Sequence, residues 1–304
     1  MKIAHLSDLH LLSLDGVPFR RFLNKRASGW INLRVKRGAI HRTAHVRAVL
    51  RAVTEARVDH VVVTGDLTNL ALEGEFELAR DILTRELGMD PSEVTIVPGN
   101  HDLYTRGAFR SARFGTYFSP WMVSDLPELA VDAGGGRFPI VRLRDGVAIV
   151  GLSSALPRPP LIAAGELGKA QIESLKRILA HPEVSRRTAV LVLHHPVLQD
   201  GSALKQYAEG LRDAAALRRA LEPLERGLIL HGHLHRRLHR TLSTEQGRLH
   251  QVGATSASLE HKAPDRMAGF NVYQIDAGSV SRIEARVYNS STNSFHVESV
   301  PRHV

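Results

Sequence analysis

Residues 96 to 104 read IVPGNHDLY, and this stretch decides how the rest of the chain is interpreted. An apolar run stops at Pro98 and a glycine follows, as at a turn, because proline ends a strand and glycine tolerates backbone angles that other residues avoid. A turn alone does not explain why Asn100, His101 and Asp102 come next. The question is whether other strands end in side chains of the same kind.

Six short apolar runs rich in β-branched residues predict buried strands of a sheet that is covered on both faces. These runs lie at 2–7, 60–65, 93–99, 147–153, 188–194 and 227–232. Helical patterns, with apolar residues three and four apart, separate them. The helical patterns lie at about 41–57, 74–87, 107–118, 168–180 and 208–222. Strands that alternate with helices predict an α/β layered fold.

After about residue 235 the pattern changes to short alternating runs, which predict antiparallel strands and hairpins. We expect this β-rich C-terminal part to form a second sheet packed on the first. The PRPP at 157–160 and the GGG at 134–136 predict surface loops. Without an internal repeat or a convincing linker, we expect a single domain over residues 1–304.

Composition limits the chemistry. The chain has no cysteine, which excludes disulfides, thiolate metal sites and a cysteine nucleophile, so any metal must be bound by nitrogen and oxygen. A net charge of +9 and a pI of about 10.2 favour an anionic partner: nucleic acid, a phosphorylated small molecule or an acidic membrane face. An arginine-rich composition with solvated side chains explains the charge equally well.

The N-terminus begins almost directly with the strand-like KIAHLS, which leaves no room for a secretion signal. No stretch reaches the roughly 20 apolar residues that a membrane-spanning helix needs. We therefore expect a cytoplasmic protein.

Five of the six predicted strands are followed directly by Asp, Asn or His. These endings are Asp8 and His10, Asp66, Asn100 to Asp102, His194 and His195, and His233 and His235. Because the carboxyl ends of strands form one rim of an open α/β sheet, we expect these side chains to converge. Imidazole with carboxylate or amide oxygen suits manganese, iron, zinc or cobalt. Two ions about 3.5 to 4 Å apart would use all these ligands, an arrangement that cleaves phosphate esters.

Each motif also has an ordinary explanation. Asp8 can cap a helix and His10 can be solvated. Asp66 can belong to a plain turn, and His194 and His195 can be a core histidine beside an exposed one. The histidines at 231, 233, 235 and 239 can bind metal adventitiously. The occurrence of all five motifs, in order and after strands, favours the metal site.

The set resembles the calcineurin-like metallophosphoesterase superfamily, whose pattern is D-x-H, G-D, G-N-H-D/E, H and G-H-x-H. All five blocks are present in order from Asp8 to His235, and the sequences of these motifs are most similar to those of the cyclic-nucleotide phosphodiesterase branch. The resemblance implies a four-layer αββα sandwich of two mixed sheets flanked by helices. It also implies two metal ions, manganese, iron or zinc.

Carried over by residue, the resemblance implies three groups of ligands. The first metal takes Asp8, His10 and His235, the second takes Asn100, His194 and His233, and Asp66 bridges them. His101 would stabilise the transition state or protonate the leaving alcohol, and Asp102 would either hold His101 or only fix the loop. The run of two histidines leaves His195 open as an alternative to His194.

The implied reaction is in-line attack by a metal-bridging hydroxide on a phosphodiester, such as a cyclic nucleotide, without a covalent phosphoenzyme. One alternative is a membrane-surface hydrolase of a phospholipid or lipid-linked diphosphate. Another is a nuclease of the same superfamily, although no added DNA-binding domain is evident and aromatic residues are only 5% of the chain. A non-catalytic scaffold is the third, but such relatives lose ligands and this chain lacks none.

A basic segment at about 17–37 follows the first motif and contains no carboxylate. Its apolar side chains fall near one helical face, so it could lie on an anionic membrane at the inner face. It could equally cap the site, with Arg20, Arg21 or Arg26 recruiting a phosphate, or be an ordinary peripheral helix. Tyr104 and Arg106 could contact substrate or simply begin a helix.

Overall fold

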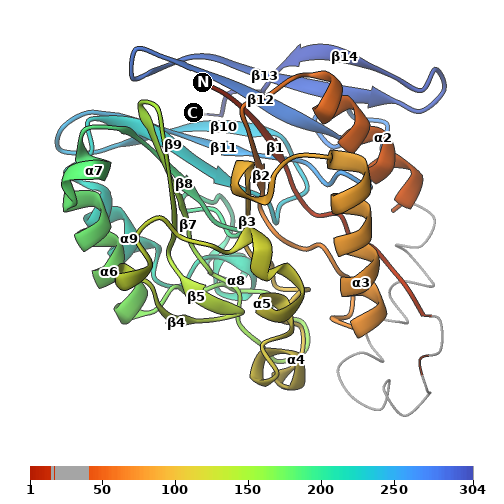
Figure 1. Cartoon of the computed structure of the whole chain (residues 1–304), viewed down its shortest axis with the longest axis horizontal. Coiled ribbons are helices and arrows are strands. Elements are labelled where there is room, and N and C mark those ends of the chain that lie inside the picture. Colours follow the sequence, from red (N-terminus) through yellow and green to blue (C-terminus); the bar gives the residue numbers. More distant parts are fainter. Residues whose placement is uncertain (15–16, 18–40, 304) are drawn as a thin grey trace.

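The computed structural model describes residues 1–14, 17 and 41–303 (Figure 1). The basic segment predicted at about 17–37 therefore lies outside the described residues, apart from Val17. Its three interpretations, as a membrane anchor, a cap or a peripheral helix, stay predictions.

Two six-stranded sheets form the centre of the molecule, in the orders β14-β13-β12-β1-β2-β3 and β10-β11-β9-β8-β7-β6. The first sheet contains β1 (Lys2–Leu6), β2 (His60–Val63), β3 (Val94–Ile96), β12 (Gly269–Asp276), β13 (Ser279–Asn289) and β14 (Ser294–Ser299). The second contains β6 (Ile140–Arg144), β7 (Val147–Gly151), β8 (Thr188–Val192), β9 (Arg226–His231), β10 (Leu238–Ser243) and β11 (Arg248–Gly253). A small hairpin joins β4 (Val131–Ala133) to β5 (Gly136–Phe138).

Both sheets are mixed. In the first, β1, β2 and β3 are parallel, whereas β12, β13 and β14 run antiparallel to their neighbours. In the second, β7, β8, β9 and β11 are parallel, and β6 and β10 complete the edges in the antiparallel sense. The parallel strands of each sheet therefore deliver their carboxyl ends to one edge.

Helices cover the outer faces of the two sheets (Figure 1). On one side lie α2 (Thr43–Glu55) and α3 (Glu73–Ile82), and on the other lie α6 (Lys169–Ala180), α7 (Pro182–Ser185) and α9 (Ala214–Leu221). Shorter helices are α4 (Arg106–Arg110), α5 (Arg113–Phe118) and α8 (Ala203–Glu209). A π-helical turn at Leu83–Leu87 extends α3, and 3₁₀ turns occupy Pro91–Glu93, Ser119–Trp121 and Pro127–Leu129. The predicted αββα sandwich is confirmed.

Alternation along β8 shows why the predicted strands read as continuous apolar runs. Val190 and Val192 join the core between the two sheets, whereas Ala189 and Leu191 pack in the second core beneath the outer helices. Because both faces of such a strand are buried, no polar residue interrupts it. The central core draws on both sheets, which supports the proposal of a single domain.

Two details of the prediction are wrong. The C-terminal strands do not form a sheet of their own, because β10 and β11 extend one sheet and β12 to β14 extend the other. An alternating pattern reports which face of a strand is buried and not which strand lies beside it. The GGG at 134–136 is not a surface loop either, since Gly134 and Gly135 are buried in the β4–β5 hairpin.

His60 in β2 makes stability depend on pH. Burial, followed by the nearby charges of Arg144 and Arg142, lowers its pKa from 6.5 to about 3, and its Nε2 lies 2.9 Å from Thr95 Oγ1. The unfolded chain therefore binds a proton between these pH values that the folded protein does not. The contribution of His60 to stability is complete above pH 6.5 and falls by about 1.4 kcal/mol for each pH unit between 6.5 and about 3.

We expect His60→Gln to reduce this acid sensitivity, because glutamine retains a polar group near Thr95 and does not titrate. The measurement is urea unfolding of both proteins at pH 7 and pH 4. The exposed His296 provides the control, His296→Gln, which should follow the wild type. An unchanged pH dependence in His60→Gln would contradict this assignment.

Candidate metal centre

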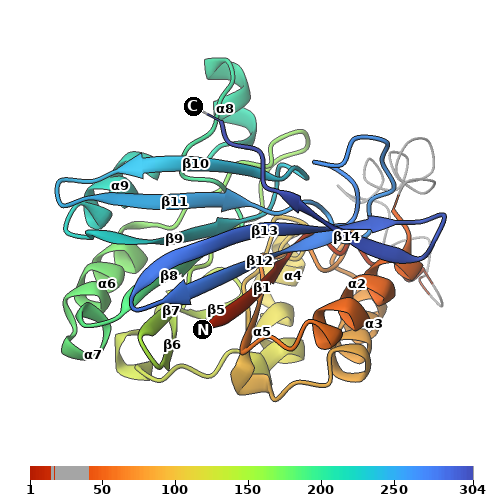
Figure 2. The ribbon, with the colours of Figure 1, turned by 90° about the horizontal axis from the view of Figure 1, so that it is seen from above.

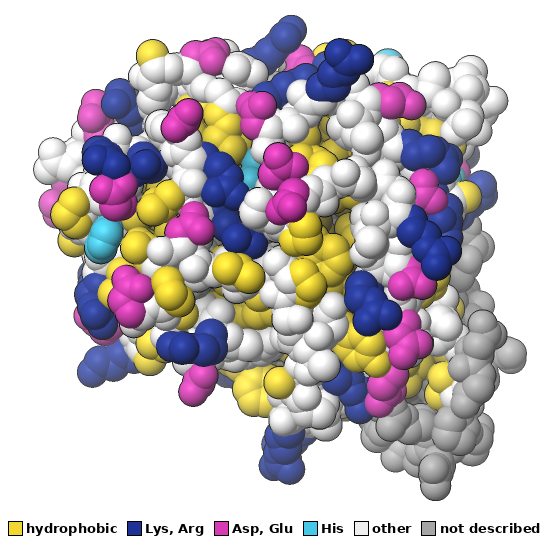
Figure 3. All heavy atoms as spheres, in the orientation of Figure 1, with side chains coloured by type: hydrophobic (Ala, Val, Ile, Leu, Met, Phe, Trp, Pro, Cys, Tyr) yellow, Lys and Arg dark blue, Asp and Glu magenta, His cyan; other side chains and the backbone are white. Residues whose placement is uncertain are grey.

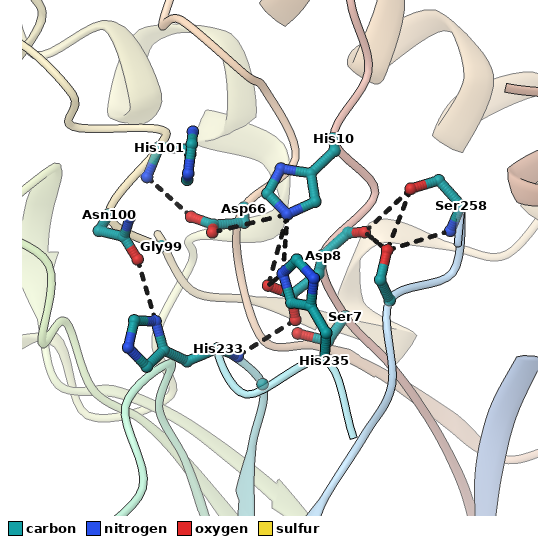
Figure 4. A network of polar contacts seen from close by, with 12 residues as sticks. Ser7, Asp8, His10, Asp66, Gly99, Asn100, His101, His233, His235 and Ser258 are labelled. Carbon is teal, nitrogen blue, oxygen red and sulfur yellow. Dashed lines mark hydrogen bonds and ion pairs between the residues drawn. The ribbon is translucent and has the colours of Figure 1, made fainter. Parts of the chain in front are cut away.

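Strands of both sheets position the candidate ligands. Asp8 and His10 follow β1, Asp66 follows β2 and Asn100 follows β3, all in the first sheet; the others follow β8 and β9 of the second. These others are His194, His233 and His235. The expected single rim is therefore wrong: the residues converge where the carboxyl ends of two packed sheets meet (Figure 4).

The backbone of these loops is unusual. Asp8, His10, Asp66, His233 and His235 have φ values of 54°, 46°, 52°, 68° and 48°. Non-glycine residues pay a conformational cost in this left-handed region and tend to gather at functional sites.

Hydrogen bonds and close packing hold the loops in this conformation. The amides of Asp8 and His10 donate to the carbonyls of Gly65 and Asp66, each at 2.9 Å, which ties the first two loops together. A side chain at Gly99 would collide with Asp66, which explains why glycine precedes Asn100. The strained conformations are thus fixed by the surrounding chain.

Asp8, His10 and His235 form the first predicted group. Nε2 of His10 lies 3.0 Å from Nε2 of His235, and Oδ1 of Asp8 lies 3.1 Å from the same His235 atom. Oδ1 of Asp8 is 3.8 Å from Nε2 of His10. The structure therefore brings all three predicted residues together.

Asn100, His194 and His233 form the second predicted group. Oδ1 of Asn100 lies 3.0 Å from Nε2 of His194 and 3.2 Å from Nδ1 of His233. Between the groups lies Asp66, whose Oδ2 is 3.5 Å from Nε2 of His194 and 3.9 Å from Nε2 of His10. This is the position that a bridging carboxylate requires.

The geometry favours His194 over His195. Nδ1 of His194 donates to the carbonyl of Thr64 at 2.7 Å, so its Nε2 faces the cluster. Both ring nitrogens of His195 are engaged elsewhere, with Ser154 Oγ and with the carbonyl of Ala163, each at 2.8 Å. A histidine that binds a metal usually donates a hydrogen bond from one ring nitrogen to the protein and turns the other ring nitrogen toward the ion.

The electrostatics of the cluster suit cations. Burial works to raise the pKa of Asp66, but His194 and His101 hold it well below its usual range. Burial lowers the pKa of His233 to about 3, and burial with the neighbouring imidazoles lowers that of His10 well below its usual value. The carboxylate is thus charged while these imidazoles keep their lone pairs, as metal binding requires.

The residues present fit two metal ions. Oδ1 of Asp8 and Nδ1 of His10 are buried and have no hydrogen-bond partner in the described part of the chain. Several lone pairs face one another, as at Nε2 of His194 and Oδ1 of Asn100, a contact that a cation between them would stabilise. Nitrogen and oxygen donors of this kind suit manganese, iron or zinc.

His101 sits beside the bridging carboxylate. Its amide donates to Oδ1 of Asp66 at 2.7 Å, and its Nδ1 lies 2.7 Å from the carbonyl of Asn69, to which it donates. Tyr104 stacks on the ring, with centroids 5.5 Å apart and planes at 11°. Backbone and ring contacts therefore fix the orientation of His101, and Tyr104, which the sequence left between two roles, touches it directly.

The contacts of Asp102 favour the second of its two predicted roles. Its buried carboxylate accepts from the amides of Gly99 and Thr68, each at 2.9 Å, and from Oγ1 of Thr68 at 3.0 Å. The Nδ1 atom of His101 donates to Asn69 and not to this carboxylate. Burial and the charge of Asp66 raise the pKa of Asp102 to about 7. We infer that Asp102 joins two loops and acts on His101 only through the backbone.

Sequence reasoning missed His41. Its ring lies 4.8 Å from the ring of His10 and 5.7 Å from that of His235, and the three can form a metal-binding group. Nδ1 of His41 lies 2.7 Å from Oγ of Ser258, and the residue pairs with Leu259 through an isolated bridge. No sequence motif identifies His41 as part of the site, because its position depends on the loop of Ser258 and Leu259, more than 200 residues further along the chain.

The fold and the two groups of nitrogen and oxygen donors define a metal-dependent hydrolase of phosphate esters. A model of the calcineurin-like phosphoesterase family matches residues 1–237, well over half of the chain, and the protein belongs to this family. The family binds two divalent metal ions. A search of curated protein sequences finds no significant match.

Solved structures share the fold at low sequence identity. A dimetal phosphatase from Danio rerio has a TM-score of 0.58 at 14% identity, with 99% of each chain covered. The purple acid phosphatase PPD1 of yellow lupin has a TM-score of 0.54 at 13% identity, over 99% of this chain and 54% of the phosphatase. The sulfate thiohydrolase SoxB of Thermus thermophilus has a TM-score of 0.52 at 17% identity, over 97% of this chain and 58% of that one.

Proposed function

We propose that this phosphoesterase hydrolyses phosphodiesters, with nucleotides, including cyclic nucleotides, as the substrate class. The observation that carries the two-metal chemistry is the place of Asp66 between one histidine of each ligand group, His10 and His194. Asp8, His10 and His235 would hold one ion, and Asn100, His194 and His233 the other. The ions would supply an acidified water as nucleophile and neutralise charge on the phosphoryl group.

Charge balance supports a diester. Two carboxylates, Asp8 and Asp66, face the centre, and no lysine or arginine contacts the seven candidate ligands among the described residues. The two ions would therefore carry most of the positive charge. A phosphodiester bears a single negative charge, which leaves less charge for such a centre to neutralise than the dianion of a monoester does.

His101 would contact the substrate beside this centre. Because Nδ1 donates to the carbonyl of Asn69, Nε2 is the ring atom that would donate to a phosphoryl oxygen or to the leaving oxygen. The ring cannot rotate away readily, because Tyr104 stacks on it and its Nδ1 donates to the carbonyl of Asn69. His41 is a further candidate at the first metal, through its nearness to His10 and His235.

The lipid-substrate alternative depends on residues 17–37, outside the described part of the chain. No helix that the structure describes is long and apolar enough to cross a membrane. On the face shown in Figure 3, lysine and arginine side chains are interspersed with carboxylates and do not gather in one patch. That distribution gives the nuclease alternative no particular support on this face.

The test compares bis-p-nitrophenyl phosphate with p-nitrophenyl phosphate on manganese-reconstituted protein, with metal content measured on the same sample. We expect faster hydrolysis of the diester and about two metal ions per chain. Faster hydrolysis of the monoester would overturn the diester proposal and leave the two-metal site intact. A single bound ion would overturn the bridging role of Asp66.

A further inference from the structure

A cavity of about 150 Å³ lies beside the loop that carries His233 and His235. We call it the α8 cavity. Its lining includes Gln199, Lys205, Leu234, Arg240, Arg266 and His303. Figure 2 shows α8 above β10, with the C-terminus of the chain beside it. Elements from four separate parts of the sequence therefore enclose this space.

Leu234 connects the α8 cavity to the metal centre along the chain. This residue stands between His233 and His235, which we assign to different metal ions. A wall of the cavity is therefore one residue away from a ligand of each ion.

The charge of the lining is positive overall, because Lys205, Arg236, Arg240 and Arg266 outnumber its one carboxylate, Asp200. Arg240 forms a two-point contact with Asp200, with Nη1 at 2.7 Å from Oδ1, and Arg236 pairs with Asp265 at 2.6 Å. Lys205 and Arg266 are exposed and form no salt bridge with a carboxylate of the described residues, although the charge of Lys205 helps to lower the pKa of Asp200. Two lining cations are thus held in salt bridges and two are not.

Buried polar atoms point to a ligand with hydrogen-bonding oxygens. Both side-chain amide atoms of Gln199, Nε of Arg240 and Nε2 of His303 are buried without a hydrogen-bond partner in the described part of the chain. Buried polar groups of this kind are nearly always paired in folded proteins. Their clustering around one small cavity, together with two cations outside salt bridges, indicates an anion with several oxygen acceptors.

We propose that the α8 cavity binds a phosphate group, and that this group is a second, non-reacting phosphate of the substrate. The proposal rests on the proposed phosphodiesterase function and specifies its substrate class as phosphodiesters that carry a further phosphate. Lys205 and Arg266 supply charge, and Gln199 and Arg240 donate hydrogen bonds. Free inorganic phosphate has the same chemistry and is the other source that the experiment distinguishes.

The first arm measures binding of radiolabelled inorganic phosphate to the manganese-loaded protein by equilibrium dialysis. We expect two phosphates per chain in the wild type, one at the metal ions and one in the cavity. Lys205→Ala/Arg266→Ala should lose one of them while keeping its metal. Gln199→Leu, which leaves the charge unchanged, should weaken the same site by about tenfold. The control, Lys176→Ala/Arg177→Ala, removes one lysine and one arginine from exposed positions on α6 and should bind like the wild type.

The second arm compares hydrolysis of a dithymidine phosphodiester with and without a 5′-phosphate. We expect the wild type to show a KM at least about tenfold lower for the phosphorylated form, and Lys205→Ala/Arg266→Ala to lose that difference. Cavity binding of phosphate without this substrate preference would assign the cavity to free phosphate and overturn the substrate assignment. Unchanged phosphate binding in Lys205→Ala/Arg266→Ala and in Gln199→Leu would overturn the site altogether. If neither diester is cleaved, the proposed function is wrong, and the dialysis still tests whether the cavity binds phosphate.

Discussion

Asp66→Asn is expected to abolish phosphoester hydrolysis and to reduce the bound metal. The Oδ2 atom of Asp66 lies between Nε2 of His10 and Nε2 of His194, one from each ligand group. An amide in its place keeps the shape but removes the negative charge that would hold two cations close together. Loss of one well-placed charged group at a reacting centre costs about 10² to 10³ in kcat, and the loss here should exceed that.

The asparagine should preserve the local fold. The carboxylate accepts from the amide of His101 at 2.7 Å through Oδ1, and an asparagine side chain can present its oxygen in the same way. Activity, metal content and thermal unfolding are measured together, with Asp132→Asn, at the exposed position of β4, as the control. A folded Asp66→Asn protein that retains two metal ions and full activity would refute the bridging assignment.

The candidate ligands could be predicted because each one lies within four residues of the end of a strand. Buried β-branched runs locate the strands, and a polar residue at the end of such a run stands out against it, as Asp66 does after HVVV. The seven candidate ligands converge in the structure, as the sequence suggested. The contributions of two sheets could not be read from the pattern, since the parallel strands at the centre of both sheets are buried on both faces.

Strand partners and weakly patterned elements could not be predicted. β12 pairs with β1 in the antiparallel sense, although some 270 residues separate Lys2 from its partner Gln274. The helix α8 has no buried residue, so it lacks the apolar stripe that reveals a surface helix. The β6–β7 hairpin was missed despite a signal, because Asp145 and Gly146 form a turn dipeptide between two apolar runs.

Positioning residues are the hardest to find in a sequence. Asn69 donates from its side chain to the carbonyl of His10 and accepts from His101 through its own carbonyl. The side chain of Asp102 accepts hydrogen bonds from backbone amides of two loops. Its position in the sequence, next to His101, does not reveal this role. Such roles depend on which loops meet, and only the packed fold determines that.

His101→Ala is expected to slow turnover by about 10² to 10⁴ while both metal ions remain bound. The side chain is outside the two ligand groups, and its backbone amide, which alanine retains, makes the bond to Asp66. The substitution therefore removes only the imidazole that we place beside the reacting phosphoryl group. The effect should appear in kcat, because an interaction made in the transition state alone leaves substrate binding largely unchanged.

The chemistry of the leaving group separates the two roles of His101. If the imidazole protonates the leaving alcohol, diesters with an acidic leaving group such as p-nitrophenol should lose little rate in His101→Ala, and alkyl diesters should lose much more. If it only stabilises charge on the phosphoryl oxygens, both should slow alike. His296→Ala on exposed β14 is the matched control. Loss of a metal ion in His101→Ala would instead make this histidine a ligand, and unchanged turnover on every diester would remove it from the reaction.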